Sequence, residues 1–186
     1  MTKDSFNLTI HMVSSLDGYI ASQDGNVSWY EAASNYEKGT EAEDPVAFLK
    51  SIDCFVVGAR TYEQALELGW PYGDVPTVVL THRELSADRD SLSFYSGDLT
   101  QLVNEHLKPS YRKVWLVGGA SLALDFIRLD LADDIRLSIL PILLGDGTRF
   151  LDRIGQERGL ELKDVSAYKN GMVELWYGVR KGADGS

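Results

Sequence analysis

The feature that most limits the fold is a set of short, wholly apolar segments that end in glycine. Cys54–Val57 ends at Gly58, and Val114–Val117 ends at Gly118-Gly119. Apolar runs of this length are typical of strands buried on both faces of a sheet. Each is followed by a segment with helical spacing, so the sequence predicts strands that alternate with helices up to about residue 130.

The remaining periodicity completes this prediction. Further strands are expected at Phe6–Val13, Thr77–Thr81, Lys113–Val117 and Asp134–Leu140, and a closing hairpin at Leu160–Tyr168 and Met172–Arg180 around Asn170-Gly171. Helices are expected at Val46–Ser51, from Thr61 to about Leu68, at Asp98–Leu107 and from near Ser121. The Thr61 helix is expected to take Thr61 as its cap and to end at Gly69. The prediction is an α/β fold with helices on both faces of a mixed sheet and an antiparallel edge.

Length and composition favour one globular domain. The chain has 186 residues, 44% of them hydrophobic and 25% charged. We expect a single domain over residues 1–182 and a disordered tail at 183–186. The single cysteine excludes an intrachain disulfide and a multi-cysteine zinc site, and no residue cluster predicts a metal. The start lacks a signal-peptide pattern and no apolar run is long enough to span a bilayer, so we expect a cytoplasmic protein.

The charge is negative and unevenly distributed. The formal net charge is -10, of which residues 1–93 carry -9 and residues 94–186 carry -1. Nucleic acids and anionic membrane surfaces are bound by basic faces, so neither is an expected partner. An anionic ligand would have to be bound locally, by backbone amides and individual arginines.

The strand ends are the candidate binding sites. Gly118-Gly119 leads from a strand into a helix with Ala120 and Ser121, where free amides and the helix dipole favour a phosphate. The alternative is a tight turn with no ligand, and the segment lacks the G-x-G-x-x-G pattern. Gly58-Ala59-Arg60-Thr61 and Thr81-His82-Arg83 follow two other strands and offer arginine and hydroxyl donors. Taken singly, these are more often a helix start and a solvated loop.

Other polar residues have two interpretations each. Asp17 precedes Gly18 in a turn, where aspartate commonly binds its own backbone, but it could also bind or protonate a substrate. His11 lies on the polar side of its strand and is more often structural. Trp29 and Tyr30 could form an aromatic wall or pack in a core. The acidic segment Glu31–Asp44 is expected to be an exposed loop or flap over the substrate pocket.

Read in order, these segments resemble the dihydrofolate-reductase-like superfamily, in particular the C-terminal reductase domain of bacterial riboflavin biosynthesis. The matching segments are Ser15–Ala21, Val57–Glu63, Val78–Arg83, Val114–Gly119 and Leu140–Gly147. The resemblance spans residues 6–180 and implies a three-layer fold with a central, mostly parallel eight-stranded sheet, an antiparallel last strand and NADPH at its carboxyl edge.

The resemblance also implies roles for individual residues. It places the nicotinamide at Val13, Ile20 and Ala21. It places the pyrophosphate at two strand ends, which comprise Gly58, Arg60, Thr61, Val117, Gly118, Gly119, Ala120, Ser121 and Leu122. The adenosine 2′-phosphate would contact Thr81, His82 and Arg83. Asp17, Trp29 and Ser34 would contact the substrate, and Asp17, or a water that it orients, would supply the proton.

Three departures limit the choice of substrate. The arginine expected directly after Gly58 is replaced by Ala59, and the first strand carries His11 where the riboflavin enzymes tend to have lysine. Ala33, Ser34 and Asn35 replace the carboxylate that binds pterin in dihydrofolate reductases. The leading prediction is an NADPH-dependent reductase that passes hydride to a C=N bond or to C1 of a ribosylamino-pyrimidine.

Alternatives remain open at this stage. They are dihydrofolate reductase activity on a pterin, a non-catalytic module that binds NADPH or a metabolite, and a dimeric scaffold without a ligand. The resemblance also implies a homodimer with a small-molecule substrate.

Overall fold

The computed structural model describes residues 5–181, so the predicted tail at 183–186 lies outside the described residues. Its centre is an eight-stranded sheet with the order β5-β4-β3-β6-β1-β7-β10-β9. The strands of this sheet are β1 (Asn7–Ser15), β3 (Cys54–Gly58), β4 (Thr77–Leu80), β5 (Leu92–Tyr95), β6 (Lys113–Val117), β7 (Asp134–Leu140), β9 (Leu160–Ala167) and β10 (Val173–Val179). A small second sheet pairs β2 (Tyr19–Ala21) with β8 (Thr148–Arg149).

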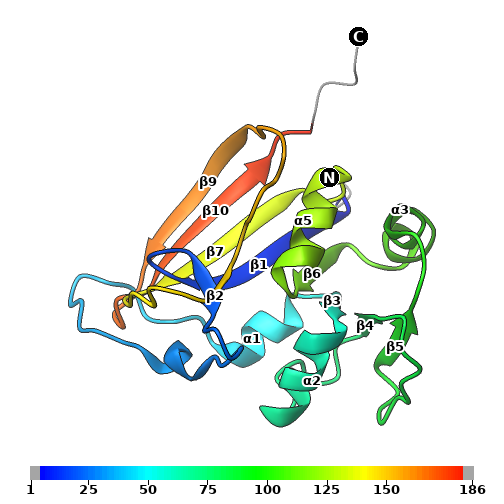
Figure 1. Cartoon of the computed structure of the whole chain (residues 1–186), viewed down its shortest axis with the longest axis horizontal. Coiled ribbons are helices and arrows are strands. Elements are labelled where there is room, and N and C mark those ends of the chain that lie inside the picture. The colour runs from blue at the N-terminus through cyan, green and yellow to red at the C-terminus, as the bar shows by residue number, and fades with distance from the viewer. Residues whose placement is uncertain (1–4, 182–186) are drawn as a thin grey trace.

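The sheet is parallel except at its C-terminal hairpin (Figure 1). β1 lies in its middle, where His11 pairs with Val117 of β6 on one side and with Arg136 of β7 on the other. β10 runs antiparallel to both β7 and β9. The predicted antiparallel C-terminal strand is thus confirmed, although the strand at the edge is β9.

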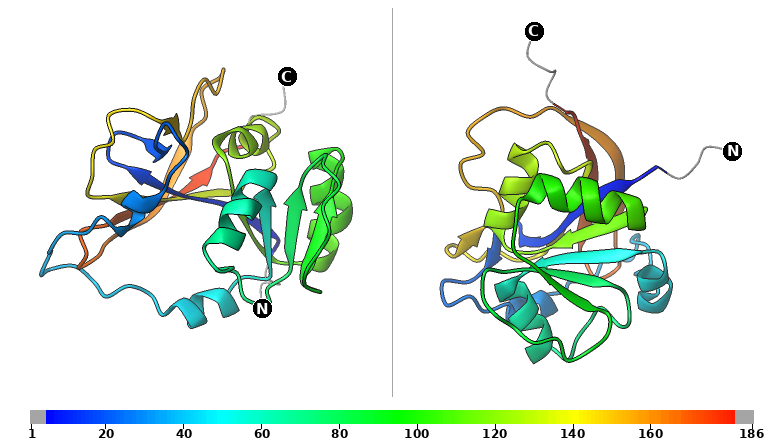
Figure 2. Two further views of the ribbon diagram at one scale, coloured as in Figure 1. Left: turned by 60° about the horizontal axis from the view of Figure 1, so that its bottom comes forward. Right: turned by 90° about the vertical axis from the view of Figure 1, so that its right-hand side faces the viewer.

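Helices cover both faces of the half of the sheet that contains β3 and β6 (Figure 2). They are α1 (Pro45–Lys50), α2 (Ala59–Glu67), α3 (Leu99–Gln101), α4 (Lys108–Ser110) and α5 (Ala120–Arg128), with the π-helical turn η2 (Leu102–Leu107) between α3 and α4 and the 3-10 helix η1 (Ser28–Glu31). One core joins β1, β3 and β6 to η2 and α5, and the other joins β3, β4 and β6 to α1 and α2. The predicted three-layer α/β fold is confirmed.

The period-two pattern of β1 assigns its side chains to these two faces. Leu8, Ile10 and Met12 are buried in the core beneath α5. His11 and Val13 point to the opposite face, which Phe48 of α1 and the segment before α1 cover. The polar residues of β1 therefore reach a part of the sheet where a pocket can form.

Several predicted boundaries were wrong. α2 begins at Ala59 with Gly58 as its N-cap residue, so Thr61 lies inside the first turn and is no cap. β1 extends to Ser15 instead of ending at Val13 because it pairs with β7 along that whole length. Two strands were missed: β5, which pairs only with β4, and the two-residue β8.

Candidate functional site

Two glycines meet at the carboxyl edge of the sheet, where β3 and β6 end side by side. A Cβ atom built on Gly118 would lie 3.5 Å from the backbone nitrogen of Gly58 and 3.4 Å from the side chain of Leu122. A larger side chain at Gly118 would crowd this junction. The glycines therefore let the ends of two strands and the starts of two helices pack closely.

The two helices that begin here expose unpaired amides to a ligand. α2 starts after Gly58 and α5 after Gly119, and neither has a side-chain hydrogen bond at its N-cap. A Cβ on Gly119 would meet nothing within 4 Å, so the space in front of α5 is open. Free amides, aligned helix dipoles and open space suit an anion, and the residues present fit a pyrophosphate.

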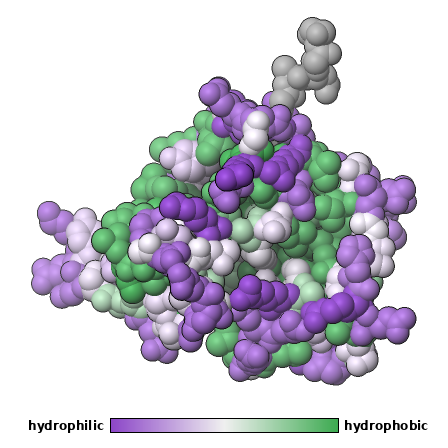
Figure 3. Space-filling view, viewed as in Figure 1, coloured by the Kyte–Doolittle hydropathy of each residue, from purple (hydrophilic) through white to green (hydrophobic). Residues whose placement is uncertain are grey.

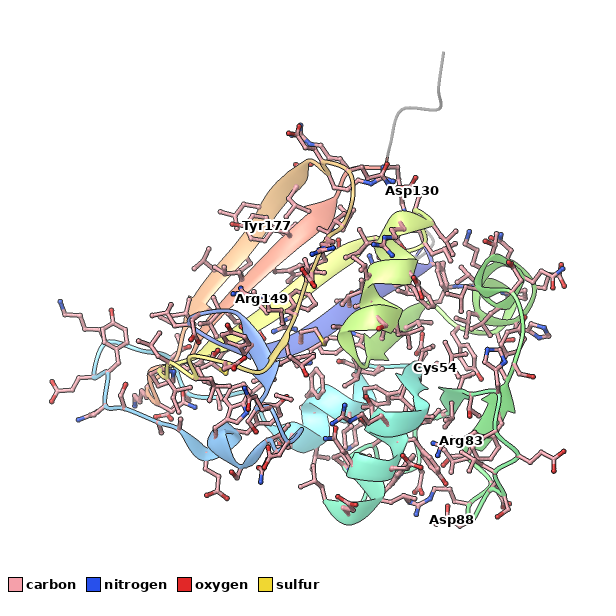
Figure 4. All side chains as sticks on the ribbon, viewed as in Figure 1. Cys54, Arg83, Asp88, Asp130, Arg149 and Tyr177 are labelled. Carbon is pink, nitrogen blue, oxygen red and sulfur yellow. The ribbon has the colours of Figure 1, made fainter. Side chains whose placement is uncertain are left out.

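The predicted phosphate-binding side chains lie beside this edge. Arg83 lies between the end of β4 and α2 (Figure 4) and forms a 2.8 Å ion pair with Glu63. Thr81 Oγ1 accepts a hydrogen bond from the Arg83 amide, and His82 is exposed. The Arg60 guanidinium rests against Gly25 and fills the place of a Cβ atom there, and the φ of 81° at Gly25 also favours glycine. Arg60 thus contacts the turn after β2.

Of the three predicted nicotinamide residues, Val13 lines a pocket, whereas Ile20 packs against the core beneath α5. Val13 lines a hollow of about 230 Å³ on the face of β1 and β7 opposite α5. Ile20 and Ala21 lie in β2, and the Ile20 carbonyl accepts a 3.4 Å hydrogen bond from the Tyr30 hydroxyl. A Cβ on Gly147 would lie 2.1 Å from the Ala21 carbonyl oxygen, so this turn requires glycine.

The pocket lies between the sheet and the segment that precedes α1. Strands β1, β6, β7 and β10 form its floor, and residues of the acidic segment and of α1 close it from above. Its lining residues are His11, Val13, Ala42, Glu43, Phe48, Trp115, Arg136, Ser138, Tyr168, Met172 and Glu174.

A hydrogen-bonded chain crosses the floor of the pocket. Arg136 donates to Glu174 Oε1 from Nε at 2.7 Å and from a terminal nitrogen at 2.6 Å. Glu174 also accepts from Ser138 Oγ at 3.1 Å and from the Tyr168 hydroxyl at 3.3 Å. Only 10% of the Glu174 side chain is exposed. Its charge is therefore balanced by Arg136 and two hydroxyl donors.

His11 belongs to the same hydrogen-bonded network on the pocket floor. Its Nε2 lies 3.3 Å from Ser138 Oγ, and the single Ser138 proton goes to Glu174, which leaves Nε2 as the donor to Ser138. Desolvation lowers the pKa of His11 to about 4, the nearby Glu174 opposes this effect and Arg136 adds to it. The imidazole is neutral at physiological pH.

Asp17 is occupied by its own loop. Its carboxylate accepts hydrogen bonds from Ser15 Oγ at 2.6 Å, from the Gly145 amide at 2.7 Å and from the Leu144 amide at 3.1 Å. The Ser15 hydrogen bond is the largest cause that lowers the pKa of Asp17 to about 2. A carboxyl group of this acidity is ionised at neutral pH and does not itself donate a proton. Of the predicted roles, orienting a water remains.

The two other predicted substrate residues, Trp29 and Ser34, lie apart from the hydrogen-bonded side chains of the pocket floor. Trp29 is 8% exposed and packs edge-on against Tyr30, with a ring distance of 4.6 Å. Its buried Nε1 has no hydrogen-bond partner within residues 5–181. Ser34 is exposed, and its side chain occupies the place that a Cβ on Gly171 would need. Ser34 thus contacts the β9–β10 turn and does not line the pocket.

The acidic segment Glu31–Asp44 is pinned to that turn. Its amides at Ser34, Tyr36 and Thr40 donate to the carbonyls of Asn170, Lys169 and Ala167. Lys169 pairs with Glu41, and Arg136 lies 3.6 Å from Glu43. The segment, which we call the flap, extends as a hydrophilic arm at the left of Figure 3. It was predicted as an exposed loop or flap over the substrate pocket, and Ala42 and Glu43 do line the pocket described above. Its attachment depends on partners about ninety or more residues away in the sequence.

Sequence reasoning missed most of the pocket. Arg136, Ser138 and Glu174 were treated only as members of strands, although each is a polar residue in a strand with apolar neighbours. Alternation alone assigns such residues to a solvent face. Their burial follows from the flap, which periodicity does not predict.

A larger hollow of about 500 Å³ lies on the opposite face, beneath residues 151–160. Its wall is mostly apolar and includes Ile127, Ile135 and Val179. It is remote from the glycine junction, so we do not assign the reaction to it. Over residues 5–181, no group of histidine, cysteine and acidic residues could hold a metal ion.

No helix within the described part of the chain is long and apolar enough to cross a membrane.

The chain is 26% identical to the uncharacterised protein YwjB of Bacillus subtilis strain 168 over 171 residues, which cover 90% of this chain and 95% of YwjB. It is 25% identical to YyaP of the same organism over 183 residues, which cover 91% and 93% of the two chains.

Solved structures share the fold at lower identity. A putative riboflavin biosynthesis protein from Shewanella sp. PV-4 matches with a TM-score of 0.81 and 20% identity, covering 95% of this chain and all of that one. A deaminase and 5-amino-6-(5-phosphoribosylamino)uracil reductase from Thermotoga maritima matches with a TM-score of 0.66 and 15% identity, and this chain covers 58% of it.

The RibD C-terminal domain family model matches residues 7–174, which include β1, the glycine junction and the pocket floor. This match bears out the resemblance that the sequence motifs gave. The chain belongs to the RibD C-terminal domain family, a family of riboflavin-type reductases.

Proposed function

We propose that this protein is an NADPH-dependent reductase that transfers hydride to a small heterocycle. The observation that carries the proposal is the position of Val13, which lines the pocket and is the residue that the resemblance places beside the nicotinamide. The pyrophosphate would be bound by the open amides at Gly58 and Gly118-Gly119, and the 2′-phosphate by Arg83. When bound, NADPH supplies the hydride.

The protein would contribute position and charge. The flap and the walls of the pocket hold the substrate against the face of β1 and limit the access of water. Neither Asp17 nor His11 carries a transferable proton at neutral pH. The proton that accompanies the hydride would therefore come from water, ordered by Asp17 or by the neutral His11. The ribosylamino-pyrimidine predicted from the sequence is one substrate of this kind, and the next section narrows the class.

Titration with NADPH and NADH, followed by tryptophan quenching and nicotinamide emission, tests the cofactor site. We expect NADPH to bind tightly and Arg83→Ala to weaken NADPH at least tenfold while leaving NADH nearly unchanged. The matched variant Glu63→Gln releases Arg83 from its ion pair and should tighten NADPH binding. No binding of either nucleotide would overturn the proposal. Binding without turnover of any heterocycle would favour a non-catalytic module.

We also propose that the protein acts as a homodimer. Leu162 and Val165 of β9 are 55% and 51% exposed and share a face with Tyr177 of β10 (Figure 4), beside the half-exposed Leu160 and Val173. An apolar sheet face of this kind suits a second copy of the chain. Light scattering should give twice the chain mass, and Leu162→Glu should halve it. The buried thiol of Cys54 is consistent with a cytoplasmic location.

A further inference from the structure

The pocket beneath the flap contains one cationic side chain, Arg136, and its charge is balanced by the carboxylate of Glu174. Arg136 is held by two hydrogen bonds to Glu174, and its guanidinium lies 5.5 Å from the ring centre of Trp115 and 5.4 Å from that of Trp176. Only 15% of its side chain is exposed. It is the one basic side chain among the residues that line the pocket in the described part of the chain, apart from the neutral His11.

The acidic groups outweigh it. Glu174 balances Arg136 from the floor, and Glu43 adds a second carboxylate from the flap at 3.6 Å. The Glu43 side chain is 58% exposed and makes no closer ion pair. Lys169 on the β9–β10 turn is occupied by Glu41, and the flap as a whole carries five acidic residues against the single Lys38. The wall therefore carries a net charge of about -1 within a negative surround.

A phosphorylated substrate meets this wall unfavourably. Arg136 already directs Nε and one terminal nitrogen at Glu174, so its charge is balanced, and a phosphate beside it would also approach the Glu43 carboxylate, which lies 3.6 Å from the guanidinium. The volume is also small. About 230 Å³ accommodates one or two fused rings, whereas the pockets that bind drug-sized ligands typically measure about 300–1,000 Å³.

Glu43 is the polar group that a ligand can reach. Its carboxylate accepts hydrogen bonds, it is accessible, and its long contact with Arg136 leaves lone pairs free. The aromatic rings of Phe48 and Trp115, 4.7 Å apart, form an apolar wall suited to a flat ring. Together these groups select for a planar molecule with N–H donors at its edge.

We propose that the pocket binds a flat heterocycle that lacks phosphate, is neutral or protonated, and donates N–H groups to Glu43. The inference rests on the proposed reductase function and names its substrate class. It differs from the phosphorylated sugar in the name of the Thermotoga maritima neighbour. Glu43 acts here as a specificity residue supplied by the flap.

A matched pair of ligands tests the inference. The purified full chain is titrated calorimetrically with 5-amino-6-ribosylaminouracil, with its 5′-phosphate, and with 2-aminopyrimidin-4-one and pterin, each in the presence and absence of NADP⁺. We expect at least one phosphate-free ring to bind, and at least tenfold more tightly than the phosphorylated compound. Tighter or equal binding of the 5′-phosphate, or no binding of any phosphate-free ring, would overturn the inference. The NADPH titration is scored separately, so failure of the substrate class and failure of the cofactor site are distinguishable.

Variants at the flap locate the selectivity. Glu43→Gln should weaken the phosphate-free ligand about tenfold, and Glu43→Lys should shift the preference toward the 5′-phosphate about a hundredfold. Glu37→Gln changes the same charge elsewhere on the flap and should leave all affinities within twofold. An unchanged ligand preference in Glu43→Lys, with NADPH binding and circular dichroism intact, would refute the role of Glu43.

Discussion

The two halves of the sheet differ in the chemical groups that they present. In the half built from β3, β4, β5 and β6, apolar strands are covered by helices on both sides, and the candidate site consists of backbone amides at glycines. In the half built from β1, β7, β9 and β10, one face carries charged and hydroxyl side chains under the flap. Backbone amides bind a phosphate group with little dependence on the side chains, whereas a pocket built from side chains depends on particular residues. Under the proposed function, the cofactor pyrophosphate and the substrate would therefore be bound by different halves of one sheet.

The largest effect that we expect concerns the ion pair on the polar half. Glu174→Ala leaves the enclosed guanidinium of Arg136 unpaired and should lower the free energy of unfolding by about 3–5 kcal/mol. The double variant Arg136→Met with Glu174→Leu removes both charges and should recover most of that loss. Urea unfolding measures both. Equal instability of the single and double variants would show that packing, and not charge, stabilises this half.

A smaller effect should follow pH. The folded-state pKa of His11, about 4, lies below its ordinary value of 6.5. Between pH 6.5 and 4, His11 is therefore protonated in the unfolded chain but not in the folded one. The free energy of unfolding consequently falls as the pH drops through this window. From pH 7.5 to 5 we expect a loss of at most about 2 kcal/mol. Urea titrations at both pH values measure this loss. Between pH 7.5 and 5, the free energy of unfolding of His11→Gln should fall by about 2 kcal/mol less than that of the wild type, because the other titrating groups are unchanged. Parallel behaviour of the two proteins would contradict the assignment.

On the helical half, the sharpest probe is Gly119→Val. The new side chain meets no protein atom within 4 Å at its Cβ and enters the open space in front of α5. NADPH affinity should fall at least tenfold, or about 1.4 kcal/mol, while the Tm stays within a few degrees of wild type. Unchanged affinity in the fluorescence titration would place the pyrophosphate elsewhere.

The smallest effects concern two helix caps, one of which lies at the end of the flap. Asp98 caps α3 by accepting from the Gln101 amide, and Asp44 caps α1 by accepting from the Val46 amide. Replacing either with Ala should cost about 1 kcal/mol. Only Asp44→Ala adjoins Glu43 and the flap, so we expect only this variant to weaken the heterocycle in calorimetry. The two costs in stability are compared by urea unfolding.

The helical half could be predicted from the sequence in most respects. β6 was placed to the residue, and Asp44-Pro45 marked the start of α1, because these signals are local: an apolar run, a capping acceptor and a proline. That Gly58 and Gly118 lie at one edge of the sheet could be predicted as well, since parallel strands align their ends. Their role in binding a ligand stays a prediction.

The polar half could not be predicted in the same way. Glu174 and Ser138 are brought together by the antiparallel pairing of β10 with β7, and Glu43 reaches Arg136 only because the flap is held by the β9–β10 turn. No local pattern encodes these contacts between distant segments. Thr61 was misassigned because its spacing suits a capping box, while the chain turns into the helix three residues earlier, at Gly58, the glycine that approaches Gly118.

The central position of β1 has a consequence for how the chain emerges during synthesis. β1 is made before both of its partners, β6 and β7, which come more than a hundred residues later. At about 5–20 residues per second, this strand waits roughly 6–25 s on the ribosome before its neighbours exist. During that time Leu8, Ile10 and Met12 lack their native covering. Nascent chains should therefore depend on early chaperone contact with β1, a demand set by strand order and not by the stability of the finished fold.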